Sequence, residues 1–177
     1  MTAPFQKAVL FEDEMRFGTR TDLKRRWTPQ GHRPKAPVKI GYEFAYLYVA
    51  LCPFNGWLYA MILPYANKES FTCFIQELNE ELNTNTLLIA DRASFHQHAC
   101  ADNTYLTLAY LPTACPELNP VERLFKEIRK GLANRIFANL QIACTTLETI
   151  VKQWQYNTHQ LINLTLFPYS HNTQLSP

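Results

Sequence analysis

The chain has 177 residues, 47% of them hydrophobic, and a formal net charge of +2 at pH 7. A chain of this size can bury one substantial core and is short for two, so we expect one domain over residues 1–160 and a tail over residues 161–177. Because the net charge is small, the chain is not one of the strongly basic proteins whose charge alone would identify them as nucleic-acid-binding.

The cysteines and apolar runs argue against secretion and against a membrane partner. The five cysteines are scattered, form no C-x-x-C pair and follow no apolar leader, which is typical of reduced thiols. The apolar run Ala45–Cys52 is far shorter than the ~20 residues that a membrane-spanning helix needs. We therefore expect a soluble cytoplasmic protein.

The first third of the chain predicts three strands and a long basic loop. Lys7–Glu14 is an apolar run ending in acids, which favours a buried strand with Asp13 at its end. Residues 16–39 contain three prolines and two glycines and are expected to form a loop. Tyr42–Cys52 and Trp57–Leu63 are rich in strand formers and flank an Asn-Gly pair, which favours a hairpin.

The middle of the chain predicts a helix and then a strand that ends in a second acid. Apolar residues recur at helical spacing over Lys68–Leu82, with Asn67 as the N-cap. Thr86–Ala90 is a short apolar strand that leads directly into Asp91. A short helix near Phe95–Ala101 and a strand near Leu106–Leu111 are expected next.

The last third predicts two amphipathic helices. Asn119, Pro120 and Glu122 have the pattern of a helix start, with an Asn cap, a proline at the first position and a glutamate at the third. The helical wheel places Glu122 at the border of the apolar stripe, beside Lys126 and Arg129. The final amphipathic helix is expected around residues 147–154.

The order of these elements predicts an α/β fold with a mixed five-stranded sheet flanked by helices. A hairpin followed by strands linked through helices requires both antiparallel and parallel pairs. In such sheets ligands gather at the carboxyl ends of adjacent strands, where Asp13 and Asp91 are expected.

The basic residues are grouped into two stretches. The first occupies residues 16–39 and the second follows Glu122 in its predicted helix. Both are suited to contact DNA phosphates, although either could be an ordinary solvated face. The basic residues concerned are Arg16, Arg20, Lys24, Arg25, Arg26, Lys126 and Arg129.

Three acids at strand ends and at a helix start are suited to hard divalent cations, because Mg²⁺ prefers oxygen ligands. Two such ions could stabilise the attacking and leaving oxygens of a phosphate displacement. Alternatively, Asp13 and Asp91 only end strands, and Glu122 is a helix-start acid paired with Lys126.

Three segments carry a resemblance to a known family. Residues 11–18 (FEDEMRFG), 88–96 (LIADRASFH) and 111–125 (LPTACPELNPVERLF) resemble the three motifs of mariner-like DDE transposases of bacterial insertion sequences. The third motif is the most specific, and the resemblance extends from about Val9 to Trp154. It implies a ribonuclease H-like fold.

The resemblance places the catalytic acids on Asp13, Asp91 and Glu122, with Glu12, Glu14 and Glu117 as supporting residues. It implies a transposase that cuts and joins DNA strands with Mg²⁺ or Mn²⁺, using two ions held by the three catalytic acids. It also implies double-stranded DNA as partner, at transposon ends and TA-type targets, and a bacterial nucleoid-associated location. Arg92 and His96 are expected to contact DNA together with the basic residues named above.

Residues 27–34 (WTPQGHRP) resemble the family's clamp, which contacts the partner subunit in related transposases. Trp27, Gly31 and Pro34 are therefore the expected clamp residues, and a homodimer is expected in the DNA complex. An ordinary exposed ribbon is the alternative.

Two departures from the family pattern leave rival functions open. Arg92 stands where the family usually has Asn, and no helix-turn-helix module precedes Asp13. We expect an upstream helix-turn-helix product of the same element as a further partner. The rivals are an inactive remnant that binds DNA or a partner, and a ribonuclease H-like nuclease that cuts without joining. A zinc site at His96, His98 and Cys100 is a weaker alternative.

Overall fold

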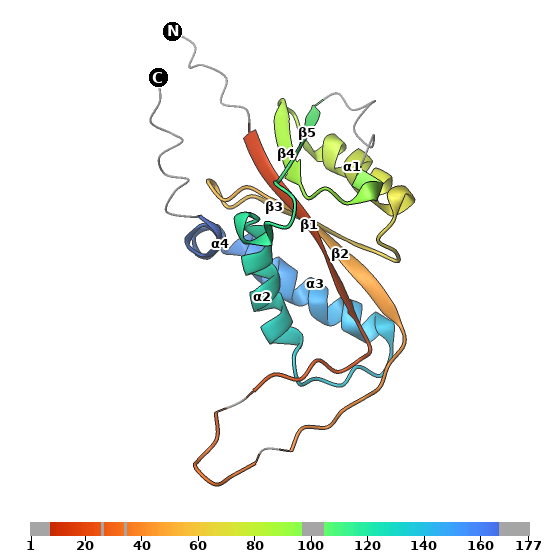
Figure 1. Cartoon of the computed structure of the whole chain (residues 1–177), viewed down its shortest axis with the longest axis vertical. Helices are drawn as coiled ribbons and strands as arrows, with labels where there is room; N and C mark the ends of the chain where they lie inside the picture. Colours follow the sequence, from red (N-terminus) through yellow and green to blue (C-terminus); the bar gives the residue numbers. More distant parts are fainter. Residues whose placement is uncertain (1–7, 26, 34, 97–104, 167–177) are drawn as a thin grey trace.

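The computed structural model describes residues 8–25, 27–33, 35–96 and 105–166, and it is built on one five-stranded sheet with the order β3-β2-β1-β4-β5 (Figure 1). The strands are β1 (Ala8–Gly18), β2 (Phe44–Leu51), β3 (Leu58–Leu63), β4 (Thr86–Ala90) and β5 (Leu106–Tyr110). β1 pairs antiparallel with β2 and parallel with β4, so the sheet is mixed, as the sequence predicts.

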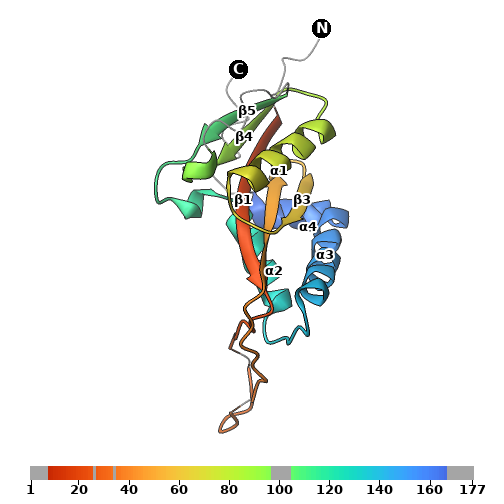
Figure 2. The same ribbon diagram turned by 90° about the vertical axis from the view of Figure 1, so that its right-hand side faces the viewer.

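The helices cover both faces of the sheet (Figure 2). They are α1 (Lys68–Glu81), α2 (Val121–Leu132), α3 (Leu140–Tyr156) and α4 (Thr158–Thr165). α1 packs on one face through Phe71 and Phe74, and α2 and α3 pack on the other against alternate residues of β1 such as Met15. Because side chains alternate along a strand, even-numbered residues of β1 face α1 and odd-numbered residues face α2.

The local sequence accounts for most element boundaries. The side chain of Asn67 accepts a hydrogen bond from the Ser70 amide at 2.9 Å and caps α1, as predicted. Asn55 and Gly56 form the hairpin turn, with Gly56 at a φ of +70°. α4 was not anticipated: it spans residue 160, where we expected the domain to end, and it buries Leu161.

β1 is longer than predicted, and this corrects the position of the first acid. The prediction ended the strand at Glu14, whereas pairing with β2 continues to Gly18, opposite Phe44. Asp13 therefore lies inside a strand, and Arg16 is a strand residue with its guanidinium 3.7 Å from the centre of the Phe44 ring. The predicted helix near Phe95 is a 3₁₀ helix, Ser94–His96, and residues 97–101 lie outside the described residues.

Residues 19–25, 27–33 and 35–43 belong to an arm that extends away from the sheet, with one branch leaving β1 and the other entering β2 (Figures 1 and 2). Its base is fixed to the loop between α2 and α3. Asn134 exchanges hydrogen bonds with the backbone of Lys24 at 3.2 Å, and the Lys39 amine donates to the Phe137 and Ala138 carbonyls at 2.8 and 2.7 Å.

Among the described residues, no helix has the length and apolar character needed to cross a membrane.

Candidate active site

Asp13, Asp91 and Glu122 line one cavity of about 340 Å³. The three acids come from the middle of β1, from the residue after β4 and from the first turn of α2. The loop between β5 and α2 completes the wall. Acids that are remote in the sequence therefore meet in one hollow.

Strand pairing explains why Asp13 and Asp91 meet. The parallel pairing of β1 with β4 ends at Phe11 opposite Ile89, and each aspartate lies two residues beyond that last pair. Equal spacing beyond a paired position puts the two side chains in corresponding places on neighbouring strands. β4 ends here while β1 continues, which opens space beside Asp13.

Asn119 attaches the start of α2 to β1 at Asp13. This buried side chain donates to the Glu12 carbonyl at 2.9 Å and to Asp13 Oδ2 at 3.4 Å. Its Oδ1 accepts from the Val121 amide at 3.1 Å, the first amide of α2. The helix cap itself is Pro120, one residue later than the predicted Asn119. The sequence indicated the helix start but not the contact with Asp13, which spans 106 residues of chain. Through Asn119, the helix start that carries Glu122 is held at the cavity.

The electrostatics of the cavity favour a cation. Burial and the charge of Glu122 raise the pKa of Asp13 from 3.8 to about 7, against a lowering effect of the Glu14 amide. A carboxylate that is destabilised by a neighbouring carboxylate is stabilised by a positive ion. Divalent ions, which take oxygen ligands, would fit these three residues; that they bind such ions stays a prediction from the sequence.

Three cationic side chains lie near the acids. Arg129 approaches Glu122 with an N–O distance of 3.6 Å, and both side chains are partly exposed. Arg92 lines the cavity, and its Nε donates to the Leu111 carbonyl at 3.2 Å. Lys126 is exposed on the same helix as Glu122. These groups leave the cavity bordered by positive charge.

A second cavity of about 300 Å³ lies at the base of the arm. Arg16, Arg20 and Arg129 contribute to its lining. Lys24 is half-buried and Arg25 is exposed, while Arg26 lies outside the described residues. Of the basic residues expected at DNA, three thus gather at one hollow beside the active-site helix.

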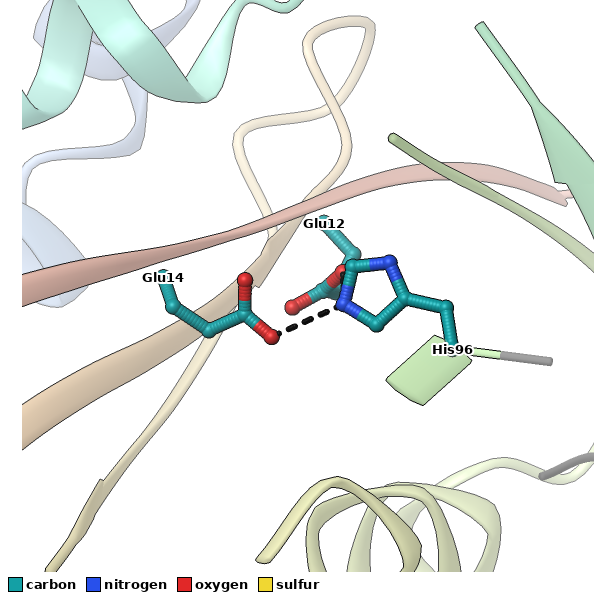
Figure 3. A group of neighbouring side chains, drawn as sticks. All are labelled: Glu12, Glu14 and His96. Atoms are coloured by element: carbon teal, nitrogen blue, oxygen red, sulfur yellow. Dashed lines mark hydrogen bonds and ion pairs between the residues drawn. The ribbon is translucent and has the colours of Figure 1, made fainter. Parts of the chain in front are cut away.

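The structure corrects the role that we expected for His96. We expected this histidine to contact DNA, but its side chain is fully buried between Phe71 and Phe95. It faces Glu12 and Glu14 of β1 (Figure 3), two acids that the sequence indicated only as supporting residues. The alternation of side chains along β1 could have shown that these glutamates point away from Asp13.

The other residues expected at special sites lie as follows. Trp27 is fully exposed on the arm, and Gly31, with a φ of +83°, forms the turn at its tip. Pro34, the third expected clamp residue, lies outside the described residues, as do His98 and Cys100 of the zinc alternative.

Solved structures with similar folds include those of the Mos1 transposase and of an integrase catalytic core domain. A chain of the Mos1 strand transfer complex matches with a TM-score of 0.65 and 16% identity, over 91% of this chain and 53% of that one. A chain of the Mos1 mariner paired-end complex with Mn matches with a TM-score of 0.63 and 18% identity, over 88% and 53%. The chain spans about half the length of these Mos1 chains. The fold is the ribonuclease H-like fold of transposases and integrases, as the sequence predicted.

The family follows from the sequence match. A family model described as DDE superfamily endonuclease matches residues 8–142, and the chain belongs to this family. It is also 35% identical over 100 residues to the uncharacterized protein y4pE/y4sA of Sinorhizobium fredii (strain NBRC 101917 / NGR234), covering 53% of this chain and 73% of that protein. The chain is therefore a DDE superfamily endonuclease domain with the fold that transposases and integrases share.

Proposed function

We propose that this domain catalyses DNA strand cleavage and strand transfer for an insertion sequence, with Asp13, Asp91 and Glu122 holding two divalent ions, Mg²⁺ or Mn²⁺. The observation that carries the proposal is the meeting of these three acids in one cavity, where burial and Glu122 raise the pKa of Asp13 to about 7. The Mos1 transposase, whose fold is similar, has been solved with Mn in a paired-end complex.

Each acid has a distinct part in binding the ions. Asp13 lies between the other two segments and is the carboxylate whose charge most needs a counter-ion. Asp91, with a side chain that is 59% exposed, offers its oxygens to the open side of the cavity. Glu122 is partly exposed on a helix that Asn119 fixes to β1. When bound, the ions would activate the attacking oxygen and stabilise charge on the leaving oxygen.

The proposed DNA path passes over the positive border of the cavity. Arg92 on the rim and Arg129 and Lys126 on α2 would neutralise phosphates next to the scissile bond. The basic residues at the base of the arm, Arg16 and Arg20, would extend this contact along the duplex.

We further propose that the arm acts as a clamp between two copies of the chain on DNA. A tryptophan exposed at the side of a protruding arm leaves a large apolar surface in water, and such surfaces mark sites of association. Trp27 and Gly31 are in the described part of the arm, and Pro34 is the third proposed residue. An upstream helix-turn-helix product of the same element would supply recognition of the transposon ends, and TA dinucleotides are the proposed targets.

The test is a cleavage and joining assay on labelled DNA that carries the ends of the encoding element. The wild-type chain with Mn²⁺ or Mg²⁺ should nick the DNA and join the ends to a target, and Asp91→Asn should abolish both reactions. Equal nicking by both proteins would overturn the catalytic assignment. Nicking without joining would instead identify a nuclease.

One observation favours a second candidate, an inactive domain that still binds DNA. Arg92 places a fixed positive charge beside Asp91 on the cavity, where it competes with cations for the carboxylates. Salt-sensitive DNA binding by the wild-type chain, with no cleavage in Mn²⁺, would support this candidate. Recovery of cleavage in Arg92→Asn would show that the arginine is the cause.

A further inference from the structure

The segment between β4 and the 3₁₀ helix is held by side chains where the backbone pairing of the sheet has ended. Beyond Ile89 no residue of β4 pairs with β1 in the described register. The segment nevertheless carries Asp91, whose carboxylate must keep its orientation to bind an ion. His96 supplies the connection from this segment back to β1 (Figure 3).

One ring nitrogen of His96 is directed at Asp91. Nδ1 lies 2.9 Å from Asp91 Oδ1 and 3.1 Å from the Asp91 carbonyl oxygen. The amide of Ala93 also donates to Asp91 Oδ1, at 2.8 Å. Nδ1 thus hydrogen-bonds to the Asp91 carbonyl and lies at ion-pair distance from Oδ1, which accepts the hydrogen bond of Ala93. These contacts act on Oδ1, so Oδ2 is the oxygen of Asp91 left for ligands in the cavity.

The other ring nitrogen is fixed by the glutamates on the face of β1 opposite Asp13. Nε2 lies 2.9 Å from Glu14 Oε1 and 3.9 Å from Glu12 Oε2. Phe71 and Phe95 hold the ring from the sides, with ring centroids at 4.3 and 4.5 Å. The imidazole therefore has one packed orientation in the core.

The neighbours of His96 define its protonation. Oxygen atoms face both nitrogens, an arrangement that favours the doubly protonated ring. Burial lowers the pKa of His96, but the hydrogen bond with Glu14 and the charges of Glu14 and Asp91 raise it above 6.5 overall. A charged donor makes a stronger hydrogen bond to a carboxylate than a neutral one does.

We propose that His96 is a positioning residue that Glu14 and Glu12 hold in place, and that it fixes Asp91 Oδ1 so that Asp91 Oδ2 faces the metal-binding cavity. The inference rests on the proposed function, since it concerns how one metal ligand is oriented. β1 then supports the site from both faces: Asp13 enters the cavity, and the glutamates on either side of it anchor the histidine that orients Asp91.

Two substitutions of His96 separate positioning from simple core packing. The amide nitrogen of Asn can take the place of Nδ1 and still donate to Asp91, whereas the longer Gln places its amide nitrogen near Nε2 and donates to Glu14. His96→Asn and His96→Gln are therefore matched: both remove the ring, but only the Asn variant keeps the donor to Asp91. Glu14→Gln is a third variant, which keeps an acceptor for Nε2 and leaves the ring in place.

The experiment measures binding of Mn²⁺ alone to the full chain, by electron paramagnetic resonance of free Mn²⁺, together with the thermal unfolding midpoint. We expect His96→Gln to weaken Mn²⁺ binding by about 10- to 100-fold, the usual effect of removing a residue that orients a metal ligand. His96→Asn should bind several-fold more tightly than His96→Gln at a similar unfolding midpoint. If His96→Gln does not fold, Glu14→Gln should show a smaller loss of Mn²⁺ affinity, of about 3- to 10-fold.

Several outcomes would overturn the inference. Unchanged Mn²⁺ affinity in the folded variants, with only the unfolding midpoint lowered, would make His96 a packing residue. A metal ion retained by Asp13→Asn and lost on Glu12→Gln would make the His96 cluster a metal site of its own. A different result would show that the proposed function itself is wrong. In that case the wild-type and Asp13→Asn proteins would both bind Mn²⁺ weakly and to the same extent.

Discussion

The raised pKa of Asp13 makes the stability of the metal-free domain depend on pH in a defined direction. The unfolded chain releases the Asp13 proton near 3.8, whereas the native state holds it until about 7. Protonation therefore stabilises the native state; this contribution is fully present below the unfolded pKa and is lost as the pH rises through about 7. Asp13→Asn cannot titrate and keeps one acceptor oxygen, which can still accept from the amide of Glu14. It loses the longer contact with Asn119, a loss that does not depend on pH.

The size of the effect follows from the two pKa values. Between about pH 5.5 and about pH 8.5 the unfolded carboxyl is ionised throughout, while the native carboxyl passes from protonated to ionised. At about 1.4 kcal/mol for each pKa unit, the free energy of unfolding should fall by roughly 2 kcal/mol more in the wild type than in Asp13→Asn. Other groups titrate in both proteins, so the difference between the proteins isolates Asp13.

The assay is urea unfolding in EDTA at both pH values, followed by fluorescence. Addition of Mg²⁺ at the higher pH should restore the stability of the wild type, because an ion that binds only the native state stabilises it. It should restore less in Asp13→Asn. Equal pH dependence in the two proteins would refute the reasoning, since Asp13 would then have an ordinary pKa.

Three further results are expected. Asn119→Ala should lower the free energy of unfolding by about 1 to 3 kcal/mol in urea titrations, because it leaves a helix-start amide and a buried carbonyl without their partner; an unchanged midpoint would show that other groups hold α2 to β1. Arg92→Asn should raise Mn²⁺ affinity several-fold in the resonance titration, and weaker binding would contradict a competing charge. Arg20→Gln should reduce the slope of log DNA affinity against log salt by about 1 if Arg20 contacts a phosphate, whereas Lys152→Gln, on α3, should leave the slope unchanged.

Much of the fold could be predicted because local patterns and tertiary structure agree in this chain. The apolar run Thr86–Ala90 gave β4 with its observed bounds, and Asn67 and the Asn-Gly turn gave the start of α1 and the hairpin. Each of these signals depends on residues within one element. α4 lacked such a signal, since it has eight residues and depends on packing against α2 and α3 for its buried face.

The acids of the site could be predicted, but their supports could not. Asp13, Asp91 and Glu122 stand in motifs and line one cavity, whereas their role as metal ligands stays a prediction. His96 reaches Glu14 across 82 residues of chain, and no local pattern distinguishes such a buried histidine from one that contacts DNA. The end of β1 was misplaced because polar residues Glu12 and Glu14 interrupt the apolar run, although both side chains are covered by tertiary contacts.

The alternation along β1 makes the domain intolerant of small insertions. A shift of one residue in this strand would turn Asp13 toward α1 and send its glutamate neighbours into the cavity, and it would exchange Met15 and Phe17 with polar residues in the same step. A single pairing register of β1 therefore both buries the core residues and brings the acids together. We therefore expect length changes in related chains to concentrate in the arm after Gly18. An added residue there changes the length of the arm and leaves the register of β1 unchanged.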